Sequence, residues 1–280
     1  AASVDASSAL AQACGDLYAA AALCMAQTDP VAKAAMTRQC AAAYGNGALK
    51  PSADALPPAP ICMPGRPAGL QMVHPSKLPR RGLGSTAGRA AFIHAIAHIE
   101  LNAIDLAWDA VYRFRELPGS FLADWVRCAD DEARHFTLLR QRLLEHGHDY
   151  GDFPVHNGLW EMCEKTAHDG LARMALVPRV LEARGLDVTP AMIDKLRALG
   201  DGATADVLEI ILREEVAHVA AGTRWYHWYC RLAGVEPRAR FVELLGEYAH
   251  GYLRGPFNAE ARLLAGFDHD ELLLLDTPPA

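Results

Sequence analysis

Apolar residues recur every three or four positions along four long stretches of the chain, at about residues 85–116, 120–146, 158–184 and 203–232. This period belongs to an α-helix that buries one face against a core. Ser85 or Thr86 is suited to cap the first of these helices, and Ser120 the second, because their hydroxyls can accept hydrogen bonds from free N–H groups of the first turn. The pattern predicts an all-α protein built on a four-helix bundle.

Shorter helices and a proline-rich segment are expected before this bundle. Apolar residues keep the helical spacing from Leu10 to Met25 and again from Val31 to Tyr44, with Thr28-Asp29-Pro30 as the break between two helices. Residues 51–84 hold eight of the 17 prolines of the chain. Proline lacks an N–H and fixes its φ angle, so this segment is predicted to be an extended strap.

Proline and glycine also interrupt the pattern later in the chain. Pro178 is expected to kink the third helix and Gly185 to end it, before a short helix from Thr189-Pro190 to about Leu199. A fifth helix is expected at about 238–252, and the tail after it is expected to pack back on the body. The predicted organisation is an N-terminal helical segment (1–50), a Pro-rich strap (51–84) and a bundle with a C-terminal extension (85–280).

Ionisable residues occupy positions of the helical stripes where apolar residues are expected. In the first long helix Glu100 lies between Ile96 and Ala103. The second helix places Glu132 and His135 in its stripe, and the fourth helix places Glu215 and His218. Transferring a carboxylate from water into the core costs roughly several kcal/mol of free energy unless the carboxylate is paired or bound to a metal. The pattern therefore indicates metal ligands, and the alternative is a salt-bridged bundle whose charges face water.

The spacing of these residues repeats. Glu132 and His135 form one Glu-x-x-His motif and Glu215 and His218 another, and in each motif the two side chains share one helix face. Glu100 precedes Glu132 by 32 residues, and Glu182 precedes Glu215 by 33. Four helices that contribute Glu, Glu-x-x-His, Glu and Glu-x-x-His form the ligand set of ferritin-like di-iron or di-manganese carboxylate bundles.

Spacing alone leaves alternatives to part of this set. Glu161 and Glu164 compete with Glu182 as the ligand of the third helix. A third Glu-x-x-His, Glu247 to His250, lies at the end of a short helix and lacks the framing apolar positions. His94 and His98 do not share the face of Glu100 and are expected to pack or to form hydrogen bonds.

Two further acids each precede a ligand glutamate. Asp131 and Glu214 are candidates to orient the histidines, since metal-bound histidines usually donate their second N–H to a carboxylate. The alternative is that both are ordinary acids facing solvent.

Composition limits the partners. The net charge of -7 gives no general electrostatic reason to bind nucleic acid or an anionic membrane, and no apolar run approaches the length of about 18 residues that spans a bilayer. The seven cysteines are odd in number and include no C-x-x-C pair. This favours reduced thiols and a cytoplasmic location, and it excludes a built-in rubredoxin-type iron site. Electrons for a redox centre would therefore come from an external donor.

Six stretches of the sequence match those of a known group: His94 to Glu100, Asp131 to His135, Tyr150 to Phe153, Val177 to Asp187, Glu215 to His218 and Gly255 to Asn258. At these stretches the sequence resembles an uncharacterised bacterial family of ferritin-like proteins, which is distantly similar to the tRNA hydroxylase that acts on isopentenylated adenosine. The resemblance implies a ferritin-like bundle with Glu182 as the ligand of the third helix. One departure is Glu214, where relatives tend to have Asp. The matching stretches cover most of residues 60–270, and only the first fifty residues resemble no known family.

The expected function is an oxidoreductase whose two Fe ions, or Mn or mixed Mn/Fe, activate dioxygen to hydroxylate or oxidise an unknown organic substrate. One alternative is metal handling, in which the site binds or oxidises iron or manganese without an organic substrate. Another is tRNA modification, against which the acidic balance argues. A metal-free interaction bundle is the last alternative.

Overall fold

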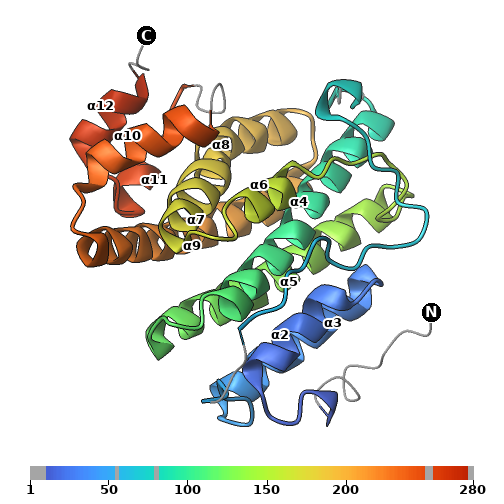
Figure 1. The fold of residues 1–280 in the computed structure, drawn as a ribbon. Helices are drawn as coiled ribbons and strands as arrows, with labels where there is room; N and C mark the ends of the chain where they lie inside the picture. Colours follow the sequence, from blue (N-terminus) through green and yellow to red (C-terminus); the bar gives the residue numbers. More distant parts are fainter. Residues whose placement is uncertain (1–10, 54–56, 79–81, 250–254, 277–280) are drawn as a thin grey trace. The chain divides into compact units, whose positions relative to one another are not determined.

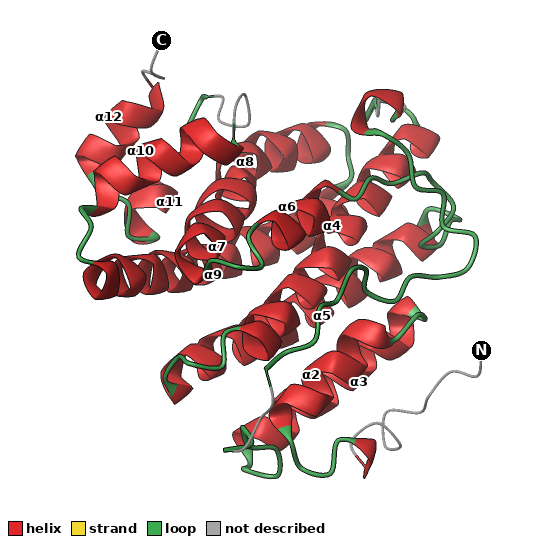
Figure 2. Cartoon of the chain, viewed as in Figure 1, coloured by secondary structure: helices red, strands yellow, loops and turns green. Residues whose placement is uncertain are grey.

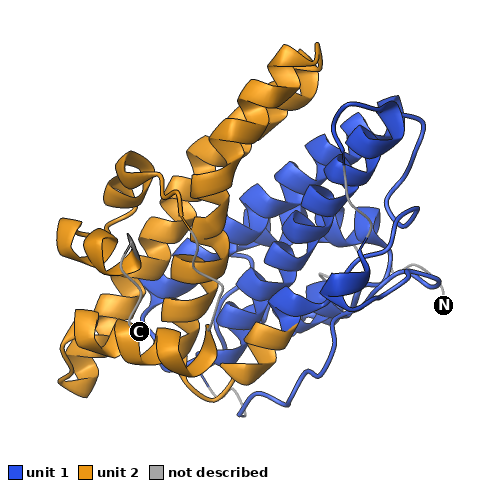
Figure 3. Ribbon diagram, turned by 90° about the horizontal axis from the view of Figure 1, so that it is seen from above, with its two compact units in different colours: residues 1–160 blue, residues 161–280 orange. Residues whose placement is uncertain are grey.

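The computed structural model describes residues 11–53, 57–78, 82–249 and 255–276 (Figures 1 and 2). In this part of the chain the structure is helical, with two isolated β-bridges, Asp16–Lys50 and Met72–Val155, and no longer strand. The predicted all-α class is confirmed. The chain forms two compact units, residues 1–160 and 161–280 (Figure 3). The division at residues 50 and 84 stays a prediction.

The first unit is built on a hairpin of two long helices, α4 (Thr86–Arg113) and α5 (Gly119–Glu145), which pack along each other. Ser85 caps α4 as predicted, because its Oγ accepts from Gly88 N at 3.0 Å. The cap predicted for α5 is wrong. Ser120 already lies in the first turn, and Pro118, which offers no side-chain hydrogen bond, is the residue before the helix.

Two N-terminal helices complete this unit: α2 (Leu17–Ala26) packs on α4, and α3 (Pro30–Gly45) packs on α5. Asp29 caps α3, which confirms the predicted break. The helix predicted from Leu10, itself outside the described residues, is interrupted in the structure. Cys14 and Gly15 adopt positive φ angles of 49° and 79°, and the Asp16 carboxylate then starts α2 by accepting from two backbone N–H groups.

The proline-rich segment is held against α4 by buried charges. Lys33 Nζ lies 2.5 Å from Asp105 Oδ1 and donates to the carbonyl oxygens of Met25 and Gly65 at 3.2 Å. Arg66 donates to the other oxygen of Asp105 and, at 2.6 Å, to Asn102 Oδ1. The segment is therefore part of the folded core of this unit.

The loop after α5 is fixed to α4 by two histidines. His98 Nδ1 accepts from the Tyr150 hydroxyl at 2.7 Å, and Nε2 donates to His156 O at 2.9 Å. His94 Nε2 accepts from Gly151 N at 2.9 Å. Burial lowers the pKa of His98 to about 3, so this ring is neutral. The expectation that both histidines form hydrogen bonds is confirmed.

The second unit departs from the predicted third helix. Residues 158–184 do not form one helix but α6 (Gly158–Lys165), α7 (Gly170–Leu176) and a π-helical turn, η2 (Val177–Glu182). The chain breaks after Lys165, and Asp169 caps the new start by accepting from Leu171 N and Ala172 N. Pro178 lacks the N–H of a regular α-turn, and the backbone widens there into η2.

The predicted end at Gly185 is also wrong. Helix α8 (Ala183–Ala198) continues through Gly185 and Pro190. Pro190 cannot donate to the carbonyl of Leu186, but Asn258 Nδ2 does so at 3.1 Å. A contact from residue 258 thus compensates for the proline, and no separate short helix forms.

The rest of the second unit packs around α9 (Gly202–Ala233), which lies close to its predicted bounds. Helix α10 (Pro237–Tyr248) packs on α7 and α9. The tail forms α11 (Ala259–Leu264) and α12 (His269–Asp276), and α11 packs on α8 and α9, which confirms that the tail returns to the body.

One described helix, α4, is long and apolar enough by composition to cross a membrane. The expectation that no apolar run approaches this length missed this helix. Most of the apolar stretch of α4 is buried within the protein, where it forms the core of the first unit. Burial against other helices thus accounts for its hydrophobicity.

Candidate metal centre

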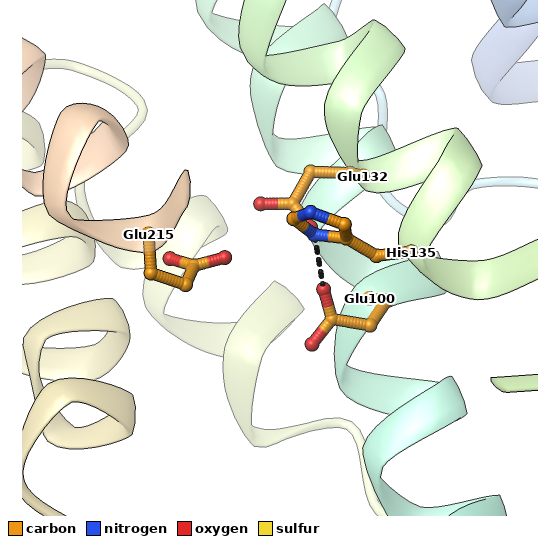
Figure 4. Close-up of side chains that lie close together, drawn as sticks. All are labelled: Glu100, Glu132, His135 and Glu215. Carbon is orange, nitrogen blue, oxygen red and sulfur yellow. Dashed lines mark hydrogen bonds and ion pairs between the residues drawn. The ribbon is translucent and has the colours of Figure 1, made fainter. Parts of the chain in front are cut away.

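Three of the predicted ligands meet inside the first unit. Glu100 comes from the middle of α4, and Glu132 and His135 come from one turn of α5 (Figure 4). Their exposed fractions are 5%, 2% and 0%. All three side chains therefore lie in the core, as their positions in the apolar stripes predicted.

The three side chains are close enough to share one ion. His135 Nδ1 lies 3.1 Å from Glu100 Oε2, the contact drawn as a dashed line in Figure 4, and 3.3 Å from Glu132 Oε2. One ligand atom from each residue lies within 4.8 Å of the corresponding atom of the others. The short turn between α4 and α5 produces this meeting, because it brings residues at similar distances from the turn to the same height.

When no metal is bound, the surroundings of this cluster favour the protonated forms of Glu100 and His135. Burial, and then the charge of Glu132, raise the pKa of Glu100 to about 8. Burial alone would lower the pKa of His135, but hydrogen bonds to Glu100 and Glu132 and their charges raise it to about 11. The imidazolium thus compensates the buried carboxylates, and its Nδ1 proton points at Glu100.

This buried Glu/His cluster could hold a metal ion. Two carboxylates and an imidazole are donors that suit Fe, Mn and Zn, and a divalent cation would supply the positive charge that the protonated histidine now provides. The residues present therefore fit a metal in their chemistry as well as their geometry.

The other three predicted ligands lie in the second unit. Glu215 and His218 are buried on one turn of α9, where His218 Nδ1 lies 3.4 Å from Glu215 Oε1. Glu182 is half-buried at the last position of η2, which packs on α9. The six residues thus fall into two groups of three, one in each unit.

The competing glutamates lie in different surroundings. Glu161 and Glu164 are both exposed on α6. Glu247 is exposed near the end of α10, and His250 lies outside the described residues. Burial therefore separates the chosen set from its competitors among the described side chains.

The two acids beside the motifs are half-buried and lie near arginines. Asp131 Oδ1 is 3.1 Å from Arg134 Nη2, and Glu214 Oε1 is 3.7 Å from Arg213 Nη2. Their role in orienting the histidines stays a prediction. Arg179, which the sequence pattern did not single out, is fully buried in η2, three residues before Glu182 in the sequence.

Comparison with known proteins identifies a family. The model of the family described as "Protein of unknown function (DUF455)" matches residues 26–273. A protein of Haemophilus influenzae (strain ATCC 51907 / DSM 11121 / KW20 / Rd), described as "Uncharacterized protein", is 46% identical over 208 residues, which cover 72% of each chain. No solved structure matches the chain. The resemblance to an uncharacterised bacterial family is thereby confirmed, and the chain belongs to the DUF455 family.

Proposed function

We propose that this protein is a dinuclear metal oxidoreductase in which a ferritin-like ligand set holds two iron ions, with manganese or a mixed pair as alternatives. Glu100, Glu132 and His135 would supply one half of the ligands. Glu182, Glu215 and His218 would supply the other half. The observation that carries the proposal is the buried cluster of two carboxylates and an imidazole in the first unit.

The likeness of the two groups supports a paired site. His135 Nδ1 lies 3.3 Å from the Glu132 carboxylate, and His218 Nδ1 lies 3.4 Å from the Glu215 carboxylate. Both motifs are buried on long helices, and each follows a further glutamate at nearly the same separation in sequence. Di-metal carboxylate bundles combine two such groups around one pair of ions.

The chain's own residues prepare this site for divalent ions. The carboxylates are buried where water cannot solvate them, so charge neutralisation by a cation is favourable. Glu100 and His135 must give up the protons they hold at the carboxyl and at Nδ1 before they can ligate. When bound, redox-active ions would supply dioxygen activation for the oxidation of an organic substrate, with an external electron donor.

The test is the metal content per chain, measured by plasma mass spectrometry on protein produced with added iron and manganese. Wild type is expected to hold about two ions per chain, as di-metal bundles do, and Glu132→Ala is expected to lose them. Asp130→Ala is the matched control. Its carboxylate is on the same helix but partly exposed beside Arg38, so this variant should keep its metal.

Two results would contradict the assignment: a wild-type protein that holds no metal although supplied with it, or a Glu132→Ala variant with undiminished content. Iron oxidation that continues well beyond the bound ions, without any organic substrate, would favour metal handling over substrate oxidation. Both measurements use the full-length chain.

A further inference from the structure

We propose that Arg179 is a positioning residue for the metal site, and that the C-terminal helix α12 holds it in place through Glu271. The inference rests on the proposed function, because it concerns the segment that carries the ligand Glu182. It assigns a role to helix α12, which lies after the last proposed ligand, His218, in the sequence.

The π-helical turn needs support from outside its own backbone. Residues Val177–Glu182 form η2, which includes Pro178 and ends at Glu182. A π-turn is less regular than an α-turn, and isolated π-turns occur frequently at functional sites. The position of Glu182 therefore depends on the contacts that fix η2 on its neighbours.

One such contact is the packing of Pro178 on Gly222 of α9. A Cβ atom at Gly222 would lie 2.2 Å from Pro178 Cγ, so only glycine permits this approach. Gly222 is four residues after His218, one helical turn further along α9. This contact sets η2 in register with the helix that carries Glu215 and His218.

The second contact is made by the Arg179 side chain, which is fully buried. Its Nε donates to Thr223 Oγ1 at 3.3 Å, next to Gly222 on α9, and its Nη2 donates to Glu271 Oε1 at 2.6 Å. Glu271 Oε2 in turn accepts from the backbone N–H of Asp268 at 3.0 Å. One guanidinium thus ties η2 to both α9 and α12.

Aromatic rings enclose the same guanidinium. Its Cζ lies 4.4 Å from the ring centroid of Phe267, 4.5 Å from Phe241 and 4.8 Å from Tyr226. A planar cation over ring faces and paired with a carboxylate has few ways to rearrange. The three rings and the carboxylate therefore restrict the Arg179 side chain to one position. The fixed side chain in turn restricts the backbone at this residue, three positions before Glu182.

The tail contains a second buried arginine that provides a matched control. Arg262 in α11 pairs with Asp187 of α8 at 2.8 and 2.9 Å and also lies over Phe267. Both carboxylates are buried. The two arginines share the Phe267 ring, but only Glu271 bonds to the arginine of η2, so a loss of affinity in Glu271→Gln that exceeds the loss in Asp187→Asn reports on the position of η2.

The experiment is an anaerobic titration of the metal-free full-length chain with Co(II), followed by its visible absorption, for wild type, Glu271→Gln and Asp187→Asn. Melting temperatures are measured in parallel on the metal-free proteins. Glu271→Gln is expected to bind Co(II) roughly 10- to 100-fold more weakly than wild type, with an altered spectrum. Asp187→Asn is expected to lower the melting temperature while affinity and spectrum stay close to those of wild type.

A milder variant covers the case in which Glu271→Gln does not fold. Thr223→Val removes the hydroxyl that Arg179 Nε contacts, and it is expected to weaken Co(II) binding with a smaller change in melting temperature. Unchanged affinity and spectrum in the folded variants would overturn the inference while the proposed function stands. An equal loss in Asp187→Asn would also overturn it. Wild type that binds no Co(II) would overturn the proposed function itself.

Discussion

His135 and Glu100 hold protons in the metal-free cluster, and both groups release them as the pH rises. The pKa of each is raised above its ordinary value, to about 11 for His135 and about 8 for Glu100. A raised pKa adds stability at low pH that is lost as the pH rises towards the folded-state value. The Glu100 contribution is therefore lost between about pH 4.5 and about 8, and that of His135 between about 6.5 and about 11.

We expect the metal-free protein to lose stability between pH 6 and pH 9, and metal affinity to rise over the same range because ions compete with these protons. Urea unfolding at several pH values checks the first expectation, and pH-dependent Co(II) titration checks the second. In Glu100→Gln the decline in stability should be shallower, since one titrating group is gone. Stability that rises over this range would contradict the protonated cluster.

The Asp105 carboxylate is also buried in the core of the first unit, where it is paired with Lys33 and Arg66. Asp105→Asn would leave the buried Lys33 and the partly buried Arg66 without their counter-charge. We expect a loss of about 3–5 kcal/mol in the free energy of unfolding, measured with urea. Asp206→Asn, which removes an exposed partner of Arg197, should change stability little. Similar effects of the two variants would contradict the buried network.

Among the elements, the long helices α4, α5 and α9 were predicted to within a few residues. Their apolar stripes run along the full length of each helix, and the positions of Glu100, Glu132 and Glu215 within the stripes showed that these residues would be buried. Side chains that lie within one helix face are fixed by local periodicity, so sequence alone reveals them.

Elements that depend on distant partners were predicted less well. The course of α8 through Pro190 depends on Asn258, and the burial of Lys33 depends on Asp105. The π-turn at Val177–Glu182 could be expected only as a kink at Pro178, since its shape depends on how it packs against α9. Periodicity contains no information on such partners.

Close packing of η2 on α9 leads to a prediction for Gly222→Ala. The added methyl group would meet the ring of Pro178, which cannot rotate away, so we expect a loss of about 1–3 kcal/mol in the free energy of unfolding. Gly246→Ala is the control. A Cβ atom at Gly246 of α10 meets nothing within 4 Å, and alanine favours a helix, so thermal melting should show equal or higher stability. If Gly222→Ala melts like wild type, the contact is looser than described.

At the scale of the whole molecule, the proposed ligands are shared equally between two compact units. An ion that binds to the ligands of a unit stabilises the folded state of that unit by mass action. Metal would therefore add to the stability of the fold, in addition to any chemistry it supplies.

Removal of the metal with a chelator should accordingly lower the melting temperature of the whole chain. With free metal at about 100 times its dissociation constant, each bound ion contributes about 2.7 kcal/mol, so the loss of one ion corresponds to roughly 5–10 °C for a protein of this size and the loss of both to a larger shift. Differential scanning calorimetry before and after chelation measures the shift. Glu132→Ala should show none, and a shift of equal size in that variant would place the metal elsewhere.

The division of ligands between the two units also has a consequence during synthesis. Ribosomes produce residues 1–160 first, and domains generally fold in that order as the chain emerges. In this order Glu100, Glu132 and His135 are enclosed in the first compact unit before the segment with Glu182, Glu215 and His218 has folded. Under the proposed assignment the complete centre arises only on the finished polypeptide, so loading of the metal pair is a step after translation.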